Sequence, residues 1–220
     1  MKQKRGNMSF FSKLFGSSQD RSLDRLFADA QQKVNQEYGP MGKVSLAIVT
    51  AAMNSRDVIK GQIVGSDEKA RKQIEVFVFY ELIYFYMHMT MRAAAAQLTE
   101  SQITKLQAYL GPIISATAID SYCAHWPEDL KQKMIAEFYD NLNKAELEYT
   151  ECTISIKGQG AEGAKQRIRA LFESLTTTIA HLVTDGQSDF AVDALVFQTT
   201  VDGWTKMRLS QLMNDVKNAN

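Results

Sequence analysis

The stretch of residues 76–91 restricts the fold of this chain more than any other feature of the sequence. It is almost entirely aromatic or aliphatic, yet it contains Glu81 and His88. A helix that crosses a bilayer needs about 20 apolar residues and rarely carries ionisable groups, so this stretch is too short and too polar to be one. A helix at a protein surface has one apolar face, whereas this one would be apolar on nearly every side. We therefore predict a central helix that other helices bury.

The composition of the whole chain favours helices packed around such a core. Three prolines and 12 glycines in 220 residues are few, which is typical of long, uninterrupted helices. The length fits one domain, and the 45% of hydrophobic residues can fill one large core. We expect an all-α, single-domain bundle of about six to eight helices over residues 18–220, arranged around the central aromatic-rich helix.

Start and stop signals locate the first helices. Apolar residues at helical spacing predict helices over about 20–37 and 42–63, and Gly39-Pro40 separates the two. We expect the aromatic helix over about 67–97, because acidic residues in its first turn would face the positive end of the helix dipole.

The next helix has a clear start and a weak point. Thr99 and Gln102 have the spacing of a capping box, in which each side chain satisfies the backbone N–H of the other. Gly111-Pro112 should kink or split this helix before it ends near residue 122, because proline removes a hydrogen-bond donor and crowds the preceding turn.

A heptad pattern predicts one long helix over about 128–156. Pro127 and the acidic residues after it form its start signal. Its apolar residues alternate steps of three and four, at Ile135, Phe138, Leu142, Ala145, Tyr149, Cys152 and Ile156. We expect this seam to pack inside the bundle, and pairing with a second copy of the chain is the alternative.

Gly158, Gly160 and Gly163 match the spacing of a dinucleotide-binding loop, with Asp185 where a ribose-binding acid would lie. That motif requires a preceding strand, whereas the heptad seam makes this segment helical, so a glycine-rich loop between helices is favoured. A helix follows and ends at Gly186. Ser188 or Asp189 would cap a last helix, which continues past residue 216.

A polar stripe on the aromatic helix is the strongest candidate for a binding site. Residues three or four apart share a helix face, so Glu81, Tyr84, His88 and Arg92 line up. They either satisfy polar groups of neighbouring helices or form a ligand pocket whose members are Glu81, Tyr84, His88, Arg92, Phe77 and Phe85. An enzyme or a haem- or metal-binding protein that uses Glu81 and His88 is the alternative function. The sequence identifies no cofactor.

Residues 1–17 form a basic, amphipathic segment. Lys13 interrupts its short apolar stretch and no cleavage site follows, which does not fit a signal peptide. The candidate contacts with a membrane or a partner fall on one helical face, at Phe10, Phe11, Leu14 and Phe15. Weak attachment to a membrane surface, docking on a protein and a disordered terminus all remain open.

Charge and cysteine content exclude several classes of protein. A net charge of zero argues against nucleic acid as the partner, and two cysteines are too few for a disulfide framework. We expect a cytoplasmic protein, at most peripheral to a membrane. Because no catalytic motif is recognisable, we predict a non-enzymatic helical interaction or small-ligand-sensing protein. Its partner would be another protein, a second copy of the chain or a small apolar ligand.

Overall fold

The computed structural model describes residues 20–123, 125–156, 160–187 and 189–219. These residues form helices and no strand, which confirms the all-α prediction. The elements are α2 (Asp20–Ile59), η1 (Lys60–Gln62), α3 (Glu68–Gln97), α4 (Glu100–Cys123), α5 (Glu128–Ile154), α6 (Gly160–Val183), α7 (Phe190–Lys206) and α8 (Leu209–Lys217). In this part of the chain no helix combines the length and the apolar character needed to cross a membrane. The expectations for Phe10, Phe11, Leu14 and Phe15 concern positions outside the described ranges.

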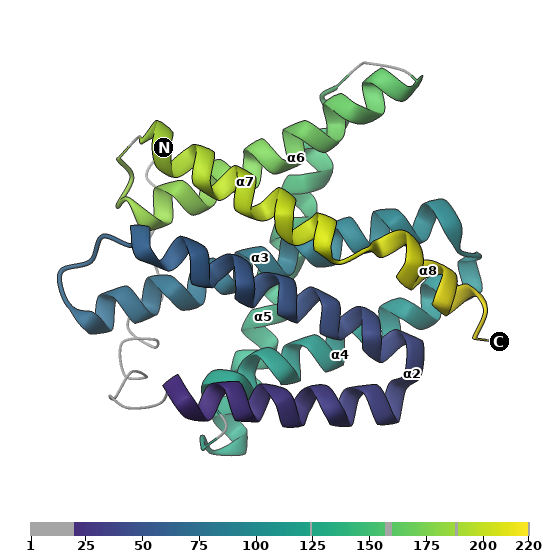
Figure 1. The fold of residues 1–220 in the computed structure, drawn as a ribbon, viewed down its shortest axis with the longest axis horizontal. Helices are drawn as coiled ribbons and strands as arrows, with labels where there is room; N and C mark the ends of the chain where they lie inside the picture. Colours follow the sequence, from purple (N-terminus) through teal and green to yellow (C-terminus); the bar gives the residue numbers. More distant parts are fainter. Residues whose placement is uncertain (1–19, 124, 157–159, 188, 220) are drawn as a thin grey trace.

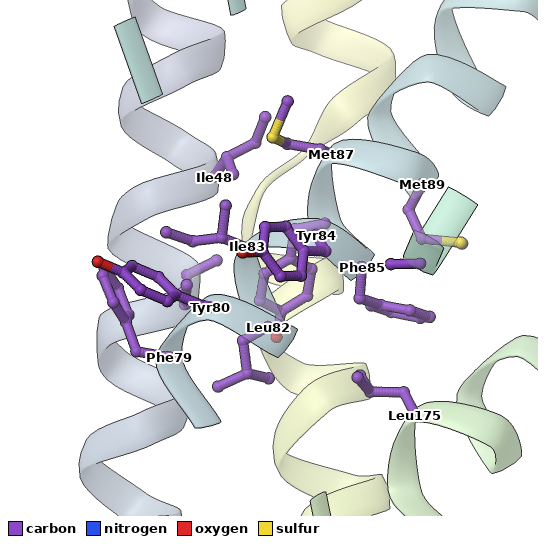
Figure 2. Packing of buried hydrophobic residues seen from close by; sticks show 14 of the residues in the cluster. Ile48, Phe79, Tyr80, Leu82, Ile83, Tyr84, Phe85, Met87, Met89 and Leu175 are labelled. Atoms are coloured by element: carbon purple, nitrogen blue, oxygen red, sulfur yellow. The ribbon is translucent and has the colours of Figure 1, made fainter. Parts of the chain in front are cut away.

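Helix α3 lies at the centre of the bundle, as the aromatic stretch predicts (Figure 1). It contacts α2, α4, α5, α6 and α8. Phe79 and Phe85 are both completely buried and point to different sides of the helix, Phe79 beside α2 and Phe85 toward α6 (Figure 2). One helix surrounded by five others has little surface left for water, which is why its sequence is apolar around most of its circumference.

Local signals set the starts of three helices where the sequence placed them. The Asp67 carboxylate accepts a hydrogen bond from the Ala70 N–H over 2.8 Å at the start of α3. Before α4, the Thr99 N–H donates to Gln102 Oε1 over 3.1 Å and the Gln102 N–H donates to Thr99 Oγ1 over 3.4 Å. Asp189 caps α7. These bonds satisfy N–H groups that have no partner inside the helix.

The two glycine-proline pairs have different outcomes. At Gly39 the backbone is non-helical, with φ of 53° and ψ of −132°, and α2 divides there into two rods that run back in opposite directions (Figure 1). Helix α4 instead continues through Pro112, so a split at that position was wrong. Leu110 and Ile114 are buried on either side of the proline, and this packing offsets the missing hydrogen bond.

The prediction of one last helix was also wrong. Arg208 has a left-handed backbone, with φ of 50° and ψ of 48°, and separates α7 from α8. No glycine or proline marks this turn in the sequence. Met207 and Leu209 are buried on its two sides, and the change of direction lets α8 pack against α2 and α3. Tertiary burial therefore decides this break.

The heptad seam of α5 packs against α3, α4 and α6. Phe138, Ala145 and Tyr149 are buried in it, whereas Leu142 is only partly buried. The helix ends at Ile154, slightly before the predicted end. The glycine motif begins in the gap after α5, and Gly160 is already the first residue of α6.

A buried arginine joins α2, α3 and α4 away from the seam. Arg56 pairs with Asp57 over 2.7 Å and with Glu75 over 3.4 Å. It also donates to the Tyr122 hydroxyl, and its guanidinium lies 5.8 Å from the centre of the Phe79 ring. Its charge is thus paired with carboxylates of α2 and α3 and hydrogen-bonded to a hydroxyl of α4.

Candidate functional site

The structure does not gather the predicted pocket residues around one cavity. Phe77, Glu81 and Tyr84 line a cavity of about 30 Å³ between α3 and α5. A space of this size holds about one water molecule rather than an organic ligand. His88, Phe85 and Arg92 lie elsewhere.

Glu81 occupies a site that disfavours its charge. Burial raises the pKa of this carboxyl from 4.5 to about 7, and the negative charge of Glu148 on α5 adds to the effect. Glu137 lines the same small cavity. A carboxyl with such a pKa can exchange a proton near neutral pH, which is also what a general acid needs.

His88 is buried against α5. Its Nδ1 lies 2.7 Å from Glu146 Oε2, and its ring centre is 5.1 Å from that of Tyr149. Its Nε2 is buried and has no hydrogen-bond partner among the described groups. The contact with Glu146 corresponds to the structural interpretation of the polar stripe, in which a neighbouring helix satisfies each polar group.

Phe85 belongs to the core. Its ring centre lies 4.9 Å from that of Phe172 on α6 and 5.7 Å from that of Tyr149 on α5. The alternative of a haem or metal site that uses Glu81 and His88 finds no additional metal ligands among the described residues. Within the described ranges, no cluster of three or more histidine, cysteine or acidic side chains is arranged to hold a metal ion.

Arg92 borders a much larger cavity, of about 670 Å³, where α3 and α6 meet the junction of α7 with α8. We call this the arginine cavity. Its lining residues are Met89, Arg92, Ala93, Ile168, Trp204, Thr205, Arg208, Leu209, Ser210 and Gln211. The sequence placed Arg92 in a pocket but missed Arg208 and Trp204, because no short-range pattern relates α3 to the turn before α8.

A second open space, of about 490 Å³, lies between the second half of α2 and α7, which run beside each other (Figure 1). We call it the α2–α7 groove. Its apolar lining includes Leu46, Ala47, Ala51, Val58, Leu195 and Met207, and its polar lining includes Asn54, Ser55, Gln198, Thr199 and Asp202. Three of the lining residues of α2, Ala47, Ala51 and Ser55, have small side chains and recur at steps of four, a signal that sequence reasoning could have used.

One buried hydroxyl group, that of Ser55, lines the α2–α7 groove and is hydrogen-bonded to the Tyr86 hydroxyl, which does not line it. Ser55 Oγ lies 2.9 Å from Tyr86 Oη, and the Tyr86 hydroxyl donates to the Thr200 carbonyl over 3.2 Å. Gly203 packs against both hydroxyls, and a Cβ at this position would be 2.1 Å from Tyr86 Oη and 2.7 Å from Ser55 Oγ. The glycine therefore lets α7 approach α2 and α3 closely.

Comparison of the chain with protein-family models, with curated proteins and with solved structures found no match. The two large cavities and the side chains around them are therefore the observations on which a function can be based.

Proposed function

We propose that the chain is a non-enzymatic ligand-sensing protein that binds a small, mostly apolar molecule in the α2–α7 groove. One observation carries the proposal: an apolar groove of about 490 Å³ has the buried, hydrogen-bonded hydroxyl group of Ser55 in its lining. Sites for small molecules are typically concave spaces of about 300–1,000 Å³ with apolar walls and a few polar groups that orient the ligand.

The distribution of polar groups favours a ligand with one polar end. Among the polar lining residues, Ser55 and Thr199 are buried, whereas Asn54, Gln198 and Asp202 are exposed. A molecule with a hydroxyl or carbonyl group can contact either set while its apolar part covers the walls. Val58, which is 53% exposed in the free protein, would lose contact with water on binding.

Binding at this place would couple the ligand to the packing of two helices. The groove has one wall from α2 and the other from α7. A ligand that touches both walls binds only when the helices are in place, so it stabilises the fold by about 2.7 kcal/mol at a concentration one hundred times its dissociation constant. Because ligand binding favours the packed arrangement of α2 and α7, the concentration of the ligand would control how firmly these helices are held together, which is a physical basis for sensing the ligand.

A neutral apolar dye tests the proposal. We expect Nile red to show a saturable increase in fluorescence with the native chain. The variant Asn54→Trp places a large ring in the groove from an exposed position of α2 and should abolish the increase. Asn143→Trp is the matched control, because Asn143 is an exposed asparagine on α5 that does not line the groove.

The two variants separate the outcomes. Loss of the signal in Asn54→Trp but not in Asn143→Trp supports binding in the groove, and native mass spectrometry should then show that the Asn54→Trp variant also loses any small molecule that co-purifies. Equal dye binding by both variants, or no saturable binding by the native chain, contradicts the proposal.

A further inference from the structure

We infer that the arginine cavity is a second binding site, and that it takes a small molecule in which a phosphate or carboxylate group is attached to an apolar body. The inference is independent of the α2–α7 groove. It rests on two arginines, an aromatic wall and a helix start that meet at one cavity of about 670 Å³.

The charges at the cavity are positive and unbalanced. Arg92 and Arg208 line it, and no acidic residue does. No ion pair with a described residue involves Arg92 or Arg208, whereas Arg56 and Arg169 are paired with carboxylates and Arg71 donates to the Gly65 carbonyl over 3.4 Å. In a chain with zero net charge, two such groups at one cavity create a local positive potential that attracts an anion.

The backbone turn at Arg208 places this residue at the cavity. Arg208 has the left-handed conformation described above, which costs a non-glycine residue free energy and occurs at only one other non-glycine position of the described chain, Asp185. This turn directs the chain from α7 into α8. As a result Arg208 lines the same cavity as Arg92, although the two are far apart in sequence.

The start of α8 adds to the positive character of the same wall. Leu209, Ser210 and Gln211 form its first turn and line the cavity. No side chain caps this turn. The Gln211 N–H already donates to the Arg208 carbonyl over 2.9 Å. The N–H groups of Leu209 and Ser210 carry partial positive charge at the helix start, so they act together with the two guanidinium groups on an oxyanion.

The remaining walls are apolar and suit the body of the ligand. Met89 is buried, and Ile168 and Trp204 are partly buried. The Trp204 ring is held edge-on by Phe172, with ring centres 5.6 Å apart. A fixed aromatic side chain beside two planar guanidinium groups matches a ring or short chain that ends in an oxyanion, because a guanidinium donates two parallel hydrogen bonds to such a group.

Phenyl phosphate is a suitable probe, because it combines a ring with a doubly charged group. Titration calorimetry of the native chain should show saturable binding that weakens as salt is added. Arg92→Gln and Arg208→Gln should each weaken binding about tenfold, since each removes charge-assisted hydrogen bonds. Arg71→Gln is the matched control, because Arg71 is exposed on α3 but lies outside the cavity, and it should leave binding unchanged.

Two comparison compounds test the two parts of the ligand. Phenol lacks the charge and inorganic phosphate lacks the ring, so both should bind at least tenfold more weakly than phenyl phosphate. Equal binding of inorganic phosphate overturns the apolar part of the inference. The absence of saturable binding at millimolar phenyl phosphate, or equal weakening by Arg71→Gln, overturns the whole inference.

The two proposed sites can fail separately. Asn54→Trp should leave phenyl phosphate binding unchanged, and Arg92→Gln should leave Nile red binding unchanged. Circular dichroism of each variant confirms folding, which we expect to be retained because Asn54, Arg92 and Arg208 are exposed.

Discussion

Replacing Glu81 by glutamine should change how the stability of the protein depends on pH. The pKa of this carboxyl is about 7 in the folded protein and 4.5 when solvent surrounds it. Between these two pH values the folded state keeps the proton while the unfolded state releases it. Raising the pH through this range therefore lowers the free energy of unfolding of the native chain. Glutamine has nearly the same shape but never ionises, so the variant lacks this loss.

The magnitude follows from the two pKa values. A difference from 4.5 to about 7 corresponds to about 3 kcal/mol once the pH exceeds the higher value. Because the Glu81 side chain is partly accessible to water, screening reduces the effect, and we expect about 2 kcal/mol. Glu81→Gln should thus be about as stable as the native chain at about pH 4 and about 2 kcal/mol more stable at about pH 8.

Urea unfolding followed by circular dichroism at several pH values measures this difference. The comparison between variant and native chain removes pH effects that both share, such as that of Asp57, whose pKa is lowered beside Arg56 and which acts in the opposite direction. Glu151→Gln, at an exposed position of α5, is the control and should show no such change. A constant difference between Glu81→Gln and the native chain from about pH 4 to about pH 8 would refute the assigned environment of Glu81.

Two further substitutions test the packing and the helix ends. Gly203→Ala should lower the free energy of unfolding by about 1–3 kcal/mol, because its Cβ would lie 2.1 Å from Tyr86 Oη. Gly61→Ala is its control, because a Cβ at Gly61 would have no atom within 4 Å. If both variants changed the free energy of unfolding in urea equally, the close approach at Gly203 would be contradicted. Asp67→Ala removes the cap of α3 and should lower the melting temperature in a calorimetric scan by an amount equivalent to about 1 kcal/mol. An unchanged melting temperature would mean that this cap contributes nothing.

Sequence spacing predicted which candidate residues share a helix face but not their surroundings. Spacing along a helix shows which residues share a face, and Glu81, Tyr84 and His88 do all lie on α3 beside α5. Spacing does not show what the facing helix supplies. Glu148 and Glu146 of α5 give Glu81 and His88 different surroundings, and a small cavity remains where an organic ligand was expected.

The sequence by itself determined the helices, most of their ends and the burial of α3. Helix caps involve residues three apart, and a stretch that is apolar on every side must be covered, so both are written in neighbouring residues. Only the tertiary structure decided the turn at Arg208, the continuity of α4 through Pro112, and the meeting of Arg92 with Arg208. Each of these depends on burial or contact between helices that are distant in sequence, and the free energy of that packing outweighs the local preferences of the chain.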